Sequence, residues 1–127
     1  MARVFTFRGK TFEELKGLTL EQFAKLITSR ERRSLLLGMT DRQKKLLENI
    51  RKHPDKFHKT HERNMVIVPE LVGTKIGIHK GNEFVLVTID EKMVGHRLGE
   101  LVLSRKRVQH SAPGVGATRS SRHIPLK

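Results

Sequence analysis

Lysine and arginine dominate the chemistry that this chain could carry out. Its 127 residues include 26 Lys and Arg against 13 Asp and Glu, so the formal net charge is +13 and the isoelectric point is about 10.8. Phosphate groups can supply the counter-charge that the acids cannot, which predicts a nucleic acid as the partner. The side chains predicted to bind it are Arg30, Arg32, Arg33, Arg63, Lys75, Lys80, Lys92, His96, Arg97, Arg105, Lys106, Arg107, Arg119 and Arg122.

The stretch MVGHRLGEL, residues 93–101, places Gly95 and Gly99 four residues apart around His96 and Arg97. Each glycine inside a helix costs about 0.5–1 kcal/mol relative to alanine. Glycine is therefore expected at these positions only if a close neighbour makes any side chain there still less favourable. The candidates for that neighbour are another helix, a ligand and a nucleic-acid backbone. We treat Gly81, Gly95 and Gly99 as candidate positions of close approach.

The kind of nucleic acid follows from the aromatic residues. The chain has no Tyr or Trp and only 6 Phe, so the stacking platform of single-strand binders is largely missing. It also lacks a recognition-helix or zinc-finger pattern. These features favour a protein that reads the backbone and shape of folded RNA. A lipid partner is less favoured, because the chain has neither a run of about 20 apolar residues nor an N-terminal signal peptide.

Two glycine-containing stretches resemble phosphate-binding motifs without their context. GKT at residues 9–11 has Val4 where a P-loop needs its first glycine. GVGATR at residues 114–119 ends in Arg119 where a dinucleotide fingerprint needs Gly or Ala. Neither stretch lies in a predicted strand–turn–helix unit, so no cofactor is expected.

Three histidines, His53, His58 and His61, lie close enough in sequence to raise zinc as a possibility. Their segment crosses a predicted helix end and carries Lys56 and Lys59, whose charge opposes a divalent cation. We therefore expect a polar linker whose histidines can contact phosphates, and no metal site. With no Cys, no nucleophile elbow and no HExxH motif, the chain is also predicted not to be an enzyme.

The first half of the chain is predicted to be helical. A threonine followed three residues later by Glu or Gln, which is the capping-box pattern, occurs at Thr11, Thr19 and Thr40. Apolar residues at helical spacing follow each threonine. We expect helices near residues 12–17, 20–37 with a break near Ser29, and 41–52.

The second half is predicted to form a small sheet. The β-branched and aromatic runs are MVIV (65–68), TKIGIH (74–79) and EFVLVTI (83–89), and the last two flank a turn at residues 80–82. Asp90 is expected to start a short helix that contains both Gly95 and Gly99. The fold class is α+β, with a three-stranded mixed or antiparallel sheet.

Residues 101–127 carry six Lys and Arg and no acid, and prolines and glycines interrupt them. This composition predicts an extended basic tail. We expect a single nucleic-acid-binding domain over residues 1–107, helical over 11–53 and sheet-containing over 63–107, followed by the tail at 108–127.

The stretch from Arg63 to Arg105 resembles the small-subunit ribosomal protein nineteen family, through IVPELVG (67–73) and above all MVGHRLGE (93–100). FTFRGKTFEEL and HSAPGVGATRSSRHIPLK are similar to the two ends of archaeal and eukaryotic members. Lys80 departs from the usual Asn before the turn glycine, and Leu101 and Val102 depart from a Phe followed by a small residue.

This resemblance implies a non-enzymatic structural protein in the head of the cytoplasmic small ribosomal subunit. Its partners would be the 3′ domain of the small-subunit ribosomal RNA and ribosomal protein thirteen. The tail from about Val108 would reach toward the decoding region and the A-site transfer RNA. The resemblance also suggests that Gly95 and Gly99 lie against RNA or against the protein's own sheet. The alternative is a free-standing electrostatic binder, such as an RNA chaperone or a chromatin-like protein.

Overall fold

The computed structural model describes residues 3–125. A two-stranded antiparallel hairpin, β1 (Thr6–Phe7) and β2 (Lys10–Thr11), opens the described chain. Arg8 (φ 52°) and Gly9 (φ 79°) form its turn. Strands of two residues are too short to leave a periodic pattern, so the sequence did not predict them.

Four helices follow: α1 (Phe12–Lys16), α2 (Leu20–Leu26), α3 (Ser29–Leu36) and α4 (Asp41–Lys52). The three predicted capping boxes are confirmed at Thr11, Thr19 and Thr40. Each hydroxyl accepts a hydrogen bond from the amide three residues later, which satisfies an amide that the helix itself leaves without a partner. The predicted break in the second helix is also confirmed, since Ile27 is extended between α2 and α3.

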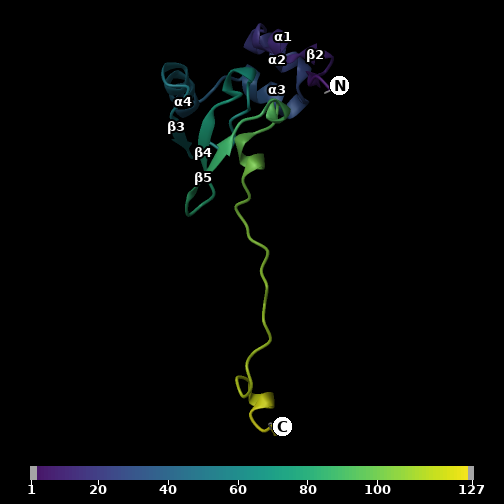
Figure 1. Ribbon diagram of the computed structural model, residues 1–127, viewed down its shortest axis with the longest axis vertical. Helices are drawn as coiled ribbons and strands as arrows, with labels where there is room; N and C mark the ends of the chain where they lie inside the picture. The colour runs from purple at the N-terminus through teal and green to yellow at the C-terminus, as the bar shows by residue number, and fades with distance from the viewer. Residues whose placement is uncertain (1–2, 126–127) are drawn as a thin grey trace.

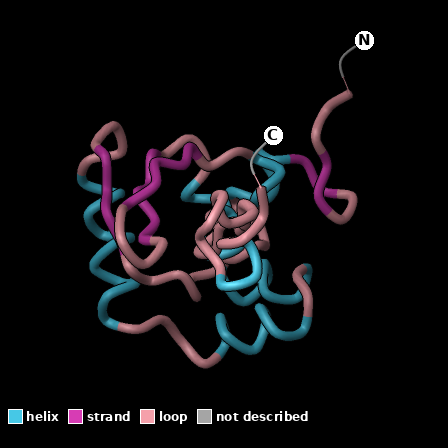
Figure 2. Tube along the Cα trace, turned by 90° about the horizontal axis from the view of Figure 1, so that it is seen from below, coloured by secondary structure: helices cyan, strands magenta, loops and turns pink. Residues whose placement is uncertain are grey.

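A mixed sheet of three strands forms the other half: β3 (Phe57–Thr60), β4 (Lys75–His79) and β5 (Phe84–Thr88). The strand order is β3-β4-β5, with β3 parallel to β4 and β4 antiparallel to β5. The predicted hairpin is confirmed, with Gly81 (φ 114°) in its turn. Figure 2 shows this sheet on one side of the folded body and the N-terminal hairpin on the other.

The prediction of a strand at 65–68 was wrong, and β3 was missed. The residues of β3 read FHKT, and their polar character is typical of a linker. Residues 65–68 are buried and extended, but they form a single isolated bridge, Val66 to Arg97, and do not join the sheet. Strand pairing depends on a partner far away in the chain, which the local pattern did not identify.

Residues 63–67 instead pair with residues 95–99 through four backbone hydrogen bonds. Ile67 donates to His96 (2.7 Å) and accepts from Gly95 (3.0 Å). The amides of Leu98 and Gly99 donate to the carbonyls of Met65 (3.0 Å) and Arg63 (2.8 Å). The segment that leads into the 67–73 motif is therefore held against the 93–100 motif, and we call residues 63–67 and 95–99 the paired motif segments.

The predicted helix with both glycines on one face is wrong. Two short 3₁₀ helices, η2 (Glu91–Met93) and η3 (Leu98–Leu101), flank a turn at residues 94–96, and only Gly99 lies in one of them. Gly95 has φ 85°, which ends helical structure before Leu98. The apolar spacing of residues 93–98 is thus produced by turns that bury Val94 and Leu98.

Both glycines are explained by close approach of the protein itself. A Cβ on Gly95 would lie 3.2 Å from the ring of Phe7 and 3.4 Å from Ile27. A Cβ on Gly99 would lie 3.0 Å from the carbonyl oxygen of Arg63. Gly81 differs, because a Cβ there would meet no protein atom within 4 Å, and its positive φ alone explains the glycine.

One hydrophobic core joins the helices to the inner face of the sheet. Leu46, Leu47 and Ile50 of α4 belong to the same buried cluster as Ile76 and Ile78 of β4. The largest side chains with almost no exposure also include Leu15, Phe23, Met65, Ile67, Val68, Leu71, Ile89, Val94 and Leu98. Leu71 lies in a third 3₁₀ helix, η1 (Pro69–Leu71).

The tail leaves the folded body after the core ends. Within the described residues, Val102 is the last that is buried. Figure 1 shows the chain beyond it running away from the body in an extended path. A short 3₁₀ helix, η4 (Arg119–Ser121), lies near its far end. The predicted extended tail is present, and its outer residues, including Val108 and Val115, are exposed.

Replacing Gly95 and Gly99 by alanine tests whether internal packing explains them. Each substitution should lower the free energy of unfolding by about 1–3 kcal/mol, because an alanine at position 95 would adopt a strained φ and an alanine at position 99 would collide with backbone. Urea unfolding of the purified variants measures the loss.

Gly114→Ala is the matched control, since a Cβ there meets no atom within 4 Å in the described chain. It should leave stability unchanged. Unchanged stability in the Gly95 and Gly99 variants, together with weaker RNA binding, would show that RNA is the close neighbour instead.

Candidate nucleic-acid interface

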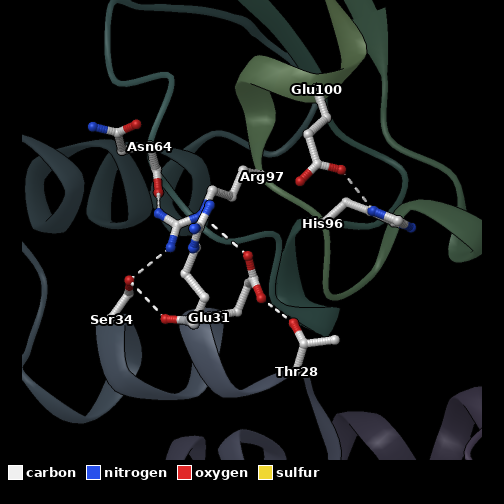
Figure 3. A network of polar contacts seen from close by, with 8 residues as sticks. Thr28, Glu31, Ser34, Asn64, His96, Arg97 and Glu100 are labelled. Carbon is white, nitrogen blue, oxygen red and sulfur yellow. Dashed lines mark hydrogen bonds and ion pairs between the residues drawn. The ribbon is translucent and has the colours of Figure 1, made fainter.

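Arg97 is at the centre of a polar network that ties the paired motif segments to α3 (Figure 3). Its Nε donates to Glu31 Oε1 (3.3 Å), its Nη1 to the carbonyl oxygen of Asn64 (2.8 Å) and its Nη2 to Ser34 Oγ (2.8 Å). Thr28 Oγ1 donates to the other carboxylate oxygen of Glu31. All of these acceptors belong to the protein, so the guanidinium is already well supplied with partners.

The environment of Glu31 favours its ionised form. The hydrogen bond from Thr28 lowers the pKa of the Glu31 carboxyl below its ordinary value of 4.5, and partial burial opposes this effect. Arg97 lowers the pKa further through its hydrogen bond and its charge. The ion pair therefore persists at neutral pH, with both side chains mostly shielded from solvent.

Arg63, like Arg97, uses its guanidinium to hold separate parts of the protein together. Its Nη1 donates to the carbonyl oxygen of His79 (2.8 Å), and its Nη2 donates to those of Gly99 (2.8 Å) and Val102 (2.6 Å). The side chain thus joins the end of β4 to the base of the tail. Bidentate and charge-assisted bonds of this kind are the strong ones in proteins, which indicates a structural role for this arginine.

Arg32 binds the carbonyl end of α2. Its Nε donates to Ala24 (3.0 Å), and its Nη2 donates to Lys25 (3.3 Å) and Ile27 (3.1 Å). A cation at this position satisfies carbonyl oxygens that have no partner within the helix and complements the helix dipole. Three arginines predicted to bind RNA therefore have their donors directed at protein carbonyls or carboxylates.

Two further predicted residues pair with an acid, His96 on the exposed surface and Lys80 with its own side chain mostly shielded from solvent. His96 Nδ1 lies 2.7 Å from Glu100 Oε2. Lys80 pairs with Glu83, and the pKa of the Glu83 carboxyl is lowered by that hydrogen bond and by the charges of Lys80 and Lys106. The pair of His96 with Glu100 is exposed and contributes little stability, so His96 can exchange its partner for a phosphate. In the other pair the Glu83 side chain is the exposed partner.

The other predicted cations are free on the surface. Within residues 3–125, none of their side chains makes an ion pair or a side-chain hydrogen bond. They are Arg30 and Arg33 on α3, Lys75 on β4, Lys92 on η2, Arg105, Lys106 and Arg107 just before the tail, and Arg119 and Arg122 on the tail. Their positions leave a basic surface that continues along the tail.

A basic groove between α4 and β3 was missed by sequence reasoning. It has a volume of about 460 Å³, and it is lined by Arg42, Lys45, Asn49 and Lys59 and by one acid, Glu62, which lies 3.9 Å from Arg42. Residues 30–63 carry eleven Lys and Arg against five acids, which was the available signal. The groove itself could not be foreseen because β3 was interpreted as a linker.

The three neighbouring histidines take separate positions. The ring of His58 lies 2.8 Å from the carbonyl oxygen of His53, whereas His61 stacks on His79 with ring centroids 4.3 Å apart. In the part of the chain that the structure describes, no group of three or more His, Asp or Glu side chains could hold a metal ion.

None of the helices described there is long and apolar enough to cross a lipid bilayer.

Comparison with known families adds one finding. Residues 33–110 match the family model described as Ribosomal protein S19. The match covers more than half of the chain, from within α3 to the start of the tail. It includes the whole three-stranded sheet, the paired motif segments and both Arg63 and Arg97.

Arg63→Gln and Arg30→Gln should separate a structural from a binding arginine. A glutamine at position 63 cannot reach all three carbonyl oxygens, so the free energy of unfolding should fall by roughly 2–3 kcal/mol. The change at position 30 should alter stability by less than about 0.5 kcal/mol, because that side chain is exposed. Chemical unfolding measures both. If Arg30→Gln destabilises the fold and Arg63→Gln does not, the structural role belongs to Arg30 and the assignment to Arg63 is wrong.

Glu31→Gln should alter the acid sensitivity of the fold. Because the folded pKa lies below the unfolded one, this group adds stability that is full above about pH 4.5 and is lost as the pH falls through the folded pKa. The variant should be less stable at neutral pH, and its deficit should shrink in acid. Thermal unfolding between about pH 7 and pH 3 measures this. Glu48→Gln, exposed on α4, is the control, and a deficit independent of pH would refute the prediction.

Proposed function

Because the chain belongs to the ribosomal protein S19 family, we propose that it binds the 3′ domain of the small-subunit ribosomal RNA in the head of the subunit. Membership makes it a ribosomal protein that binds ribosomal RNA and serves in translation. The family is one of structural ribosomal proteins and not of enzymes. The finer assignment, including a place in cytoplasmic ribosomes, is our proposal.

The observation that carries the proposal is the division of the cations into two groups. Arg32, Arg63 and Arg97 donate to protein acceptors, whereas Arg30, Arg33 and the tail cations point to solvent with the chain's acids far too few to neutralise them. An exposed surplus of this size supports phosphate binding. If it neutralised six to ten phosphates, affinity would fall roughly 10³–10⁵-fold between about 50 and 200 mM salt.

We therefore propose different roles for the predicted site residues. Arg30, Arg33, Lys75, Lys92, Arg105, Lys106, Arg107, Arg119 and Arg122 contact phosphates directly. Lys80 and His96 do so by exchanging Glu83 and Glu100 for phosphate. Arg32, Arg63 and Arg97 act as positioning residues, because their donors hold the backbone that carries the others.

The tail supports a second part of the proposal. Residues 108–125 are almost wholly exposed and have no acid, which supports a polyanion as the partner that orders them. We propose that this tail reaches toward the decoding region and the A-site transfer RNA, and that residues 1–107 form the unit that binds ribosomal RNA. The end of the core at Val102 supports this boundary.

Two further assignments rest on the resemblance of the chain's ends and motifs. We propose that the protein belongs to the archaeal and eukaryotic branch of the family, because residues 5–15 and 110–127 resemble that branch. We also propose ribosomal protein thirteen of the small subunit as its neighbour.

Sedimentation of ribosomes through a sucrose gradient at high salt tests the proposal. Cells should express the tagged full chain or a variant that ends at residue 107. Both should sediment with the small subunit after the wash, because residues 1–107 contain the folded core. The variant should be impaired in decoding, measured as misreading of a reporter codon.

Recovery of the full chain at the top of the gradient would mean a loose electrostatic binder and would reject the ribosomal assignment. Loss of only the shortened chain would mean that the tail anchors the protein, which contradicts the proposed boundary. Normal decoding with the shortened chain would remove the proposed role of the tail.

A further inference from the structure

The outer face of the three-stranded sheet has a composition that the fold alone does not require. Side chains alternate across a strand, and Ile76 and Ile78 point inward to the core. The opposite face, which we call the outer sheet face, is made by Phe57, Lys59, His61, Lys75, His79, Phe84 and Leu86. Phe57 and Leu86 on this face are 44% and 57% exposed.

Three rings on the outer sheet face form one cluster. The rings of His61 and His79 lie 4.3 Å apart between centroids, at an angle of 33°. Phe84 meets both with its edge, at 5.1 Å from His61 and 4.8 Å from His79. The three residues come from β5, the end of β4 and the residue after β3, so the cluster exists only in the folded chain.

A fourth ring extends the same surface. Phe57 lies over Gly77 of β4, where any Cβ would collide with the ring. The glycine therefore lets the phenyl ring lie against the sheet. This provides a broad apolar surface beside the cluster, on a face that has no covering helix in the described structure (Figure 1).

Cations accompany these rings. Lys59 Nζ lies 5.4 Å from the centroid of Phe84 and 6.0 Å from that of Phe57, within the range of a cation–π interaction. Lys75 is directly opposite Phe57 in the strand register. The strands at 57–60, 75–79 and 84–88 contain no Asp or Glu. The outer sheet face is therefore aromatic and positively charged.

We infer that the outer sheet face stacks unpaired bases of RNA, with Lys59 and Lys75 binding the adjacent phosphates. Sheets that bind single strands combine exposed rings with cations in this way, because every base has a face that can stack. A protein partner would bury the apolar rings without needing the lysines, so the charge favours RNA. The inference rests on the proposed function in that ribosomal RNA supplies the bases.

The test uses the purified full chain and a double variant, Phe57→Leu with Phe84→Leu. Leucine keeps an apolar side chain for packing and removes the stacking face. The probes are an oligoadenylate of about ten nucleotides and an abasic ribose-phosphate strand of the same length. Fluorescence anisotropy at one fixed salt concentration measures both affinities.

The full chain should bind the oligoadenylate at least about tenfold more tightly than the abasic strand, because each stacked base adds affinity. The double variant should lose this preference and keep its affinity for the abasic strand. Equal binding of the two probes by the full chain would overturn the inference. So would an undiminished preference in the double variant.

Two controls guard against unfolding. Phe12→Leu makes the same change in α1, where Lys16 Nζ also lies over the ring at 4.5 Å, and should leave the preference for bases intact. The double variant Phe57→Tyr with Phe84→Tyr keeps both rings and should preserve the preference. If both double variants lose it equally, stacking is not the cause and the inference fails.

Binding to a transcript of the 3′ domain separates this inference from the proposed function. Failure of the full chain to prefer that transcript over an unrelated RNA of equal length rejects the proposed function, whatever the oligoadenylate shows. Tight transcript binding without any preference for bases rejects only the stacking inference. Normal RNA binding by the leucine variant, with loss of a neighbouring protein from washed subunits, would assign the face to a protein and also reject it.

Discussion

The backbone pairing between residues 63–67 and 95–99 is the constraint on which the rest of this structure depends. Arg63 extends it to the end of β4 and to the base of the tail, and Arg97 extends it to α3 through Glu31 and Ser34. The helices, the sheet and the tail are therefore all connected to the paired motif segments. The paired segments require glycine at residue 95, where the chain turns with a positive φ, and at residue 99, where two backbones approach closely.

This arrangement gives a physical reason for the two kinds of cation in a chain of such high charge. Arginine is suited to binding several carbonyl oxygens at once because its guanidinium is planar and permanently charged. The clamps at Arg63 and Arg97 use that geometry inside the fold. The cations that remain are on α3, on the sheet, in the groove beside α4 and along the tail, where no protein acceptor in the described chain restrains most of them. The paired motif segments are thus held rigidly by arginines, while the remaining cations are exposed and free to bind phosphates. This combination suits recognition of a phosphate backbone by its shape.

The surfaces differ in what they could recognise. The tail and α3 offer charge alone, which is indifferent to base identity. The groove adds Asn49, whose side-chain amide can accept and donate hydrogen bonds. The outer sheet face adds aromatic rings, and it is the only one of these described surfaces that could tell an unpaired nucleotide from a paired one. A protein that uses all three would fix both the position and the local structure of its RNA.

Much of this protein was determined by its sequence. The capping boxes placed three helix starts, because a threonine and a residue three positions later act within one turn and need no distant partner. The β4–β5 hairpin was predictable for the same reason, and the motifs at 67–73 and 93–100 pointed to the family that residues 33–110 match. Tertiary structure alone decided that FHKT at 57–60 is a strand, that MVIV at 65–68 pairs with the glycine-containing segment and that three arginines bind protein carbonyls or carboxylates. It also gathered two phenylalanines and two histidines on one face. Each of these outcomes depends on contacts between residues far apart in the chain, and a local pattern of residue types carries no information about which distant segment will supply them.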